Sequence, residues 1–196
     1  MATELSRLIK KSEQDKLHSD AARKAAYIWQ NSQPATNHQY LSKKRVKAHG
    51  LRTYKGSLVI PVFNHDTLVS VQFIDAEGNK RFLAGSKLKG SYSQLGQYVP
   101  DKPILICEGW ATGASLFEST GNLILVAFSA GNLKEVAQYV RSLHPTNQII
   151  IMSDNDVSGV GQTAAREAAL AIGGKYLIPD TTGFDWNDEI NKEVNV

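Results

Sequence analysis

The chain has 196 residues, of which 42% are hydrophobic and 8% aromatic, so it can bury one medium core or two small ones. Its one cysteine excludes an internal disulfide framework, and no apolar run approaches the roughly 20 residues that cross a bilayer. The net charge is only +3, so any contact with nucleic acid depends on local clusters of basic residues. We therefore expect a protein of the reducing cytoplasm, without a membrane segment.

The first part of the chain, up to about residue 31, predicts one or two amphipathic helices, because apolar residues recur there at helical spacing. These residues are Leu5, Leu8, Ile9, Ala22, Ala25, Ala26 and Trp29. Since Trp29 continues the spacing, packing is a more probable role for it than stacking on a base.

A dense basic group follows a breaker-rich connection at 31–37. It consists of Lys43, Lys44, Arg45 and Lys47. Taken alone, such a group is typical of a solvated surface. After it, β-rich runs at 57–62, 67–74 and 80–83, separated by turn residues, predict a small antiparallel unit.

From residue 103 onward, strand and helix patterns alternate. Short apolar runs predict strands, and longer segments between them predict helices. The strands are expected at 104–107, 123–127, 148–152 and 175–178, and the helices at about 111–119, 132–142 and 160–172. This order predicts an α/β domain with a central parallel sheet.

Carboxylates directly follow two of these strands: Glu108 follows the first, and Asp154 and Asp156 follow the third. Residues just past the carboxyl ends of parallel strands face the crevice where α/β sheets bind ligands, so the three side chains should meet at one edge. Like charges that close are unfavourable unless a cation compensates them, and oxygen ligands suit Mg²⁺ or Mn²⁺. The sequence therefore predicts a metal site that works on phosphates, although Glu108 alone could be an ordinary exposed carboxylate.

The segments at 106–113 and 153–161 resemble the Toprim domain shared by bacterial primases, topoisomerases and certain nucleases. Upstream, residues 58–62, 80–83 and 87–92 resemble the small subdomain that precedes Toprim in the catalytic core of DnaG-type primases. The resemblance is closest to primases of conjugative plasmids and phages, and it extends over the chain from about residue 20. It implies a helical segment at 1–35, a β-rich subdomain at 36–100 and a Toprim domain with a mostly parallel sheet at 101–196.

The resemblance also implies roles for acidic residues. Glu108, Asp154 and Asp156 are similar to the family's catalytic, metal-binding carboxylates. Asp185 and Asp188 resemble a final acidic motif that adds metal ligands, with the choice between the two open. The same stretch is equally typical of an ordinary helix N-cap.

Basic residues receive roles in the same way. Arg81 and Lys89 are similar to two positions that the primase core uses against nucleotide triphosphates or the nascent chain. The position of the basic group before a primase-like core favours binding of single-stranded template, mainly through phosphates. The residues expected there are Lys43, Lys44, Arg45, Lys47, Arg52 and Lys87.

The function implied is that of a DNA primase catalytic core, a nucleotidyltransferase that makes short RNA primers from ribonucleoside triphosphates on single-stranded DNA, with a helicase or relaxase as a further partner. DnaG-type primases carry a cysteine-rich zinc module before this core and a helicase or helicase-binding module after it, and this sequence has neither, so we expect an excised core or a compact relative. Two alternatives stay open. A Toprim nuclease would not need the segment at 80–90, and a non-catalytic single-stranded DNA-binding protein would tolerate loss of the carboxylates.

Overall fold

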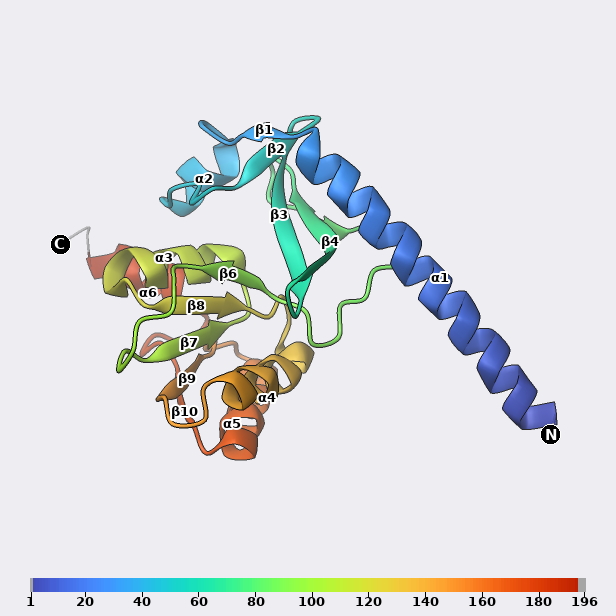
Figure 1. Ribbon diagram of the computed structural model, residues 1–196. Helices are drawn as coiled ribbons and strands as arrows, with labels where there is room; N and C mark the ends of the chain where they lie inside the picture. The colour runs from blue at the N-terminus through green and yellow to red at the C-terminus, as the bar shows by residue number, and fades with distance from the viewer. Residues whose placement is uncertain (1, 194–196) are drawn as a thin grey trace. The chain divides into compact units, whose positions relative to one another are not determined.

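The computed structural model describes residues 2–193, which form two compact units (Figure 1). The first unit contains the residues up to 40 and 50–91, and the second contains 41–49 and the residues from 92 onward. These bounds differ from the predicted segments 1–35, 36–100 and 101–196. The helical segment groups with the first unit, and two pieces of the expected β-rich subdomain, 41–49 and 92–100, group with the second. No helix among the described residues is both long and apolar enough to cross a membrane.

The first unit is built on a five-stranded sheet in the order β1-β2-β3-β4-β5, with every neighbouring pair antiparallel. The strands are β1 (Gln33–Pro34), β2 (Arg52–Tyr54), β3 (Ser57–Asn64), β4 (Thr67–Ile74) and β5 (Lys80–Phe82). The predicted antiparallel unit is thus confirmed, and β1 and β2 extend it beyond the runs that the sequence indicated.

One continuous helix, α1 (Ala2–Gln30), packs on this sheet through its C-terminal half. Ala25 and Ile28 join Val59, Val71 and Phe73 in a buried apolar cluster, against which Trp29 also packs. The apolar residues of the N-terminal half are exposed, among them Leu5, Leu8 and Ile9. The sequence predicts one or two amphipathic helices, and the structure has one, whose N-terminal half buries no apolar face because only the last turns of α1 have strands to pack against (Figure 1).

The second unit contains a mostly parallel sheet in the order β10-β9-β7-β8-β6. Its strands are β6 (Ser93–Leu95), β7 (Ile104–Cys107), β8 (Leu123–Val126), β9 (Ile149–Met152) and β10 (Lys175–Leu177). Only β6, paired with β8, runs antiparallel. The predicted central sheet is confirmed, and the short edge strand β6 was not predicted because three residues carry too little periodicity.

Helices cover both faces of this sheet (Figure 1). They are α3 (Trp110–Thr120), α4 (Leu133–Leu143), α5 (Val160–Ile172) and α6 (Trp186–Glu193), with the 3-10 turn η1 (Ala130–Asn132) before α4, and the chain also forms the short α2 (Gln39–Lys44). Helix α3 packs on β6, β7 and β8 with α6 beside it, whereas α4 and α5 pack on β7, β9 and β10. The connections after the neighbouring strands β7 and β9 therefore leave toward opposite faces, and α/β sheets generally bind ligands at the carboxyl ends of strands arranged in this way.

Candidate active site

Glu108 and the aspartates lie at the same edge of the sheet because β7 and β9 are adjacent and parallel. Cys107 and Met152, the last residues of these strands, are register partners, so Glu108 and Ser153 follow them at the same edge of the sheet. Asp154 and Asp156 come next, in the connection to α5. The topology brings together residues about 45 positions apart in the sequence, as expected for the carboxyl ends of parallel strands.

The carboxyl group of Glu108 has an unusual electrostatic environment. Burial raises its pKa from 4.5 to about 7, and the nearby charges of Asp154 and then Asp156 add to the increase. The backbone N–H of Ala130, at the start of η1, donates a hydrogen bond to Glu108 and partly offsets the rise. A carboxylate with this pKa is close to half protonated at neutral pH, which fits a general acid or base or a site that awaits a cation.

Asp156 is held by the beginning of α5. Its Oδ2 accepts a hydrogen bond of 2.9 Å from the backbone N–H of Gly161, and its Oδ1 accepts one from the hydroxyl of Ser158. These bonds, that of Ser158 first, lower the pKa of Asp156. Asp156 is therefore held in place as an anion. Its negative charge favours the protonated form of Glu108.

The absence of a side chain at Gly161 leaves the space between these carboxylates open. A Cβ atom built there would lie 2.8 Å from Asp156 Oδ2 and 3.3 Å from Glu108 Oε1, with Ser153 Oγ at 3.4 Å. The space that a methyl group would fill is thus bounded by two carboxylates and a hydroxyl. Such an oxygen-only set suits a hard divalent cation.

The charges of Asp154 and Asp156 act on Glu108, but the three predicted metal ligands do not form a complete coordination sphere. Within residues 2–193, no group of three or more His, Cys, Asp or Glu side chains is arranged to hold a metal ion. The donor chemistry, the open space at Gly161 and the raised pKa of Glu108 nevertheless fit a divalent cation. A bound positive charge would favour the ionised form of Glu108, which burial and then the two aspartates disfavour.

Asp185 and Asp188 are engaged in the N-terminal cap of α6. Asp185 Oδ1 accepts a bond of 2.9 Å from the backbone N–H of Asp188, and Asp188 Oδ2 accepts one of 3.3 Å from that of Asp185. Lys44 Nζ lies 3.5 Å from Asp185 Oδ2 and 3.6 Å from Asp188 Oδ1. The structure therefore has the helix-cap geometry that was the alternative to metal binding, and it adds an ion-pair partner for both carboxylates.

Asp185 nevertheless lies at the same end of the sheet as the other acids. Burial raises the pKa of the Cys107 thiol well above its usual range, and the charges of Asp154, Glu108 and Asp185 add to the effect. Cys107 itself is a fully buried, free thiol at the end of β7. It acts as a core residue, as its apolar neighbours in the sequence indicated.

Two asparagines that the sequence did not single out organise this region. Asn187 is buried and donates bonds of 2.8 Å to Ser115 Oγ on α3 and 2.7 Å to the carbonyl of Lys44. Asn155, between the two aspartates, donates a bond of 2.9 Å to the carbonyl of Pro179, while Gln162 donates one of 3.0 Å to its side-chain oxygen. No local pattern marks these roles, because Pro179, Ser115 and Lys44 are 24, 72 and 143 positions from the asparagines they contact.

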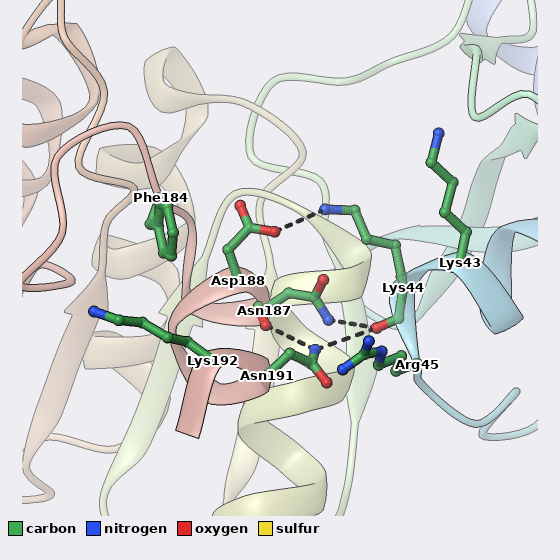
Figure 2. Close-up of a pocket in the computed structure, with 8 residues that line it drawn as sticks. All are labelled: Lys43, Lys44, Arg45, Phe184, Asn187, Asp188, Asn191 and Lys192. Atoms are coloured by element: carbon green, nitrogen blue, oxygen red, sulfur yellow. Dashed lines mark hydrogen bonds and ion pairs between the residues drawn. The ribbon is translucent and has the colours of Figure 1, made fainter. Parts of the chain in front are cut away.

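The basic group divides between several environments. Lys43, Lys44 and Arg45 line a cavity of about 490 Å³ in the second unit (Figure 2). The backbone N–H of Lys47 donates a bond of 2.8 Å to Glu118 on α3, and its side chain is exposed.

The predicted basic residues of the first unit have partners of their own. The Arg52 guanidinium lies 4.7 Å from the ring centroid of Trp29 and donates a bond of 2.7 Å to the Trp29 carbonyl. Arg81 is exposed on β5, with its guanidinium 4.4 Å from the ring centroid of Phe73. Lys87 and Lys89 are exposed in the following loop, where their carbonyls accept bonds from Ser91 and Asn64 respectively.

Comparison with known proteins identifies relatives. Residues 103–195 match the family model of the Toprim domain. The chain is 31% identical over 187 residues to a DNA primase TraC of Escherichia coli, in an alignment that covers 85% of this chain and 17% of that protein. A second DNA primase TraC of Escherichia coli is 31% identical over 159 residues, which is 71% of this chain and 11% of that protein. The chain thus spans less than a fifth of the length of the curated relatives it matches.

Solved structures share the fold. The primase fragment of the bacteriophage T7 primase-helicase protein aligns with a TM-score of 0.56 at 18% identity, covering 84% of this chain and 80% of that one. A DnaG primase catalytic domain bound to single-stranded DNA aligns with a TM-score of 0.58 at 14% identity, covering 93% of this chain and 76% of that one. At these identities the likeness establishes the architecture.

Proposed function

Since residues 103–195 form a Toprim domain within the fold of primase catalytic cores, we propose that this chain is the catalytic core of a DNA primase that acts in the cytoplasm. It would join ribonucleoside triphosphates into short RNA primers on single-stranded DNA, in a plasmid or phage setting. The observation that carries the proposal is Glu108 at the end of β7, with its pKa raised to about 7 by burial and by Asp154 and Asp156 from the neighbouring strand end. The similarity to DNA primase TraC supports it.

Glu108, Asp154 and Asp156 are the residues that would hold Mg²⁺ or Mn²⁺. The bound cation would supply Lewis-acid activation of the attacking hydroxyl and neutralise charge on the triphosphate. The chain prepares the site in three ways: Gly161 keeps the space free, the Gly161 N–H and Ser158 hydroxyl fix Asp156, and the Ala130 N–H orients Glu108. Asp185 would be a further ligand only after releasing Lys44, and the same holds for Asp188.

Basic residues would bind the substrates. We assign Arg81 and Lys89 to the triphosphate or the growing chain, because both are exposed and complement phosphate charge. We assign the basic residues around 43–47 to the template, since all of them except the half-buried Lys44 are exposed. A helicase or relaxase is a further proposed partner, since relatives such as the T7 protein join a primase to a helicase in one chain.

The test is a primer-synthesis assay on several single-stranded templates with Mg²⁺ or Mn²⁺. Asp154→Asn combined with Asp156→Asn removes two charges with little change of shape, so we expect incorporation of labelled ribonucleotides to fall by roughly 100-fold or more while the circular dichroism spectrum is kept. Failure of the wild-type protein to extend even an annealed primer would refute the proposal. Metal-dependent cleavage of labelled DNA without triphosphates would favour a Toprim nuclease instead.

A further inference from the structure

A cavity of about 490 Å³ in the second unit lies between the 43–45 segment and α6 (Figure 2). Phe184 is the only apolar residue among those that line it. The lining residues are Lys43, Lys44, Arg45, Phe184, Asn187, Asp188, Asn191 and Lys192. Sites for small ligands occupy roughly 300–1,000 Å³, so this cavity can admit one nucleotide unit.

Lys44 links the 43–45 segment to α6 and to Asp185 through hydrogen bonds and ion pairs. Its carbonyl accepts a bond of 2.7 Å from Asn187 and a weaker one of 3.5 Å from Asn191, and its ammonium group pairs with Asp188 at 3.6 Å and with Asp185. Figure 2 shows the contacts of Asn187, Asn191 and Asp188, all on α6, converging on Lys44. The charge of Lys44 is therefore largely compensated inside the protein, and this residue is a poor candidate for binding a ligand.

The other three cations flank the cavity. Lys43 and Arg45 stand on the side of α2, and Lys192 stands on the side of α6 near Phe184, with its Nζ 5.8 Å from the ring centroid (Figure 2). The backbone of Arg45 has a φ of 54°, a left-handed turn that ends α2 and directs the chain away from it. Lys192 also pairs with Glu189 at 3.8 Å and donates a hydrogen bond of 3.0 Å to Thr181 Oγ1. The four cations set against Asp185, Asp188 and Glu189 leave a net charge of about +1.

We propose that this cavity binds one nucleotide unit of a single DNA strand, with Lys43, Arg45 and Lys192 on the phosphates and a base stacked on Phe184. Cationic grooves with an aromatic platform are the general solution for binding single strands without sequence preference. The proposal rests on the proposed primase function, for which it names part of the template track. It adds Phe184 and Lys192 to the predicted template-binding residues and removes Lys44 from them.

Charge favours a strand over a free triphosphate. A net charge of about +1 matches one phosphodiester group, which carries about one negative charge, whereas a triphosphate carries about four. The carboxylates of Asp185, Asp188 and Glu189, which pair with Lys44 and Lys192, would also repel a triphosphate.

The test is fluorescence anisotropy of a labelled single-stranded oligonucleotide over a series of KCl concentrations. Phe184→Ala should weaken binding by roughly 5-fold or more at every salt concentration and leave the salt slope unchanged, because it removes stacking alone. Lys43→Gln and Lys192→Gln should each weaken binding and reduce the slope of log K against log[KCl] by about 0.7. Phe184→Tyr should restore the wild-type affinity, since it keeps the aromatic ring.

Matched controls lie on β10 in the same unit. Tyr176→Ala and Lys175→Gln also remove an exposed aromatic ring and an exposed lysine, and they should leave affinity within about twofold of wild type. The inference is overturned if the wild-type protein does not bind the strand, if the cavity variants behave like the β10 variants, or if they lose affinity for ATP and not for the oligonucleotide. Primer synthesis is measured separately, so a protein that binds strands through this cavity but makes no primer would refute only the proposed activity.

Discussion

At the scale of single residues, the site depends on how Glu108 and Gly161 share a small space. Burial and two aspartates disfavour the ionised form of Glu108. Gly161, which has no side chain, leaves free the space next to the carboxylates of Glu108 and Asp156. Without a ligand, the buried carboxylate lowers stability and the space at Gly161 lowers packing density. Such features are common at sites that bind a charged partner.

The raised pKa of Glu108 predicts how stability depends on pH. Between about 4.5 and 7 the folded state holds a proton that the unfolded state releases, so the free energy of unfolding should fall as pH rises through this window. Glu108→Gln removes the fall: it should be more stable than wild type at pH 8 by on the order of 1–2 kcal/mol, a figure discounted for partial solvent exposure, and about equal at pH 4.5. Urea unfolding in EDTA at several pH values measures this, and an unchanged pH profile in the variant would contradict it.

Gly161→Ala should impair metal binding more than folding. The new Cβ would lie 2.8 Å from Asp156 Oδ2 and 3.3 Å from Glu108 Oε1, so both carboxylates must shift and Asp156 loses its bond to the Gly161 N–H. We expect Mn²⁺ affinity, measured by calorimetry, to drop by roughly 10-fold, with a loss of stability of about 1–3 kcal/mol. Gly131→Ala, where a Cβ meets nothing within 4 Å, is the control. Equal affinities in the two variants would exclude the open space at Gly161 as part of the site.

At the scale of elements, α6 holds the 41–49 segment to the second unit. Its first turn contains the reciprocal Asp185–Asp188 cap, and its buried Asn187 reaches both α3 and the carbonyl of Lys44. The basic residues next to Lys44 therefore keep their place through a helix that lies some 140 positions later in the chain. These hydrogen bonds fix the positions of the residues that line the cavity in Figure 2.

Asn187→Ala should destabilise the protein by about 2–3 kcal/mol, because it removes two hydrogen bonds and leaves the buried Ser115 hydroxyl with one partner fewer. Asn191→Ala, on the same helix and only half-buried, should cost about 1 kcal/mol or less. Chemical unfolding of both variants checks the difference. If the two are equally stable, Asn187 is not the link that we infer.

At the scale of the whole molecule, primer extension should be easier than initiation. The sequence has one cysteine and no cluster that could replace the zinc module of the family it resembles, so nothing in it is expected to hold the first two nucleotides on bare template. With an RNA already annealed, that entropic cost is removed, and extension should exceed de novo synthesis by roughly 10-fold or more. A paired assay with and without annealed primer measures the ratio, and efficient, site-specific initiation by this chain would contradict the expectation.

Arg81→Ala and Lys89→Ala provide a second measurement on the same assay. Both should reduce extension by roughly 10-fold while leaving affinity for single strands within about twofold, because we assign them to the triphosphate or growing chain. An equal loss of strand binding would move them to the template-binding set.

Much of the fold could be predicted from the sequence, because the patterns that mark a helix or strand lie within the element itself and its flanking residues. The strands at 104–107 and 67–74 and the helix at 160–172 were predicted with their observed bounds, since apolar periodicity and flanking glycines mark them. The sequence did not show that the N-terminal half of α1 buries no apolar face, because its apolar spacing is the same whether or not a sheet lies beneath it. Strands β1, β2 and β6 are too short to show a period.

The sequence by itself determined which chemistry the chain can carry: carboxylates at two strand ends, glycines where a helix begins, and a dense basic group. Only the tertiary structure decided how those residues are used. Lys44, which the sequence suggests as a template ligand, forms ion pairs with Asp185 and Asp188, which it suggests as metal ligands. Lys43, Arg45, Phe184 and Lys192 surround one cavity. The physical reason is distance: ion pairing, burial and hydrogen bonding act over a few ångströms in space, and no local pattern encodes contacts between residues some 140 positions apart.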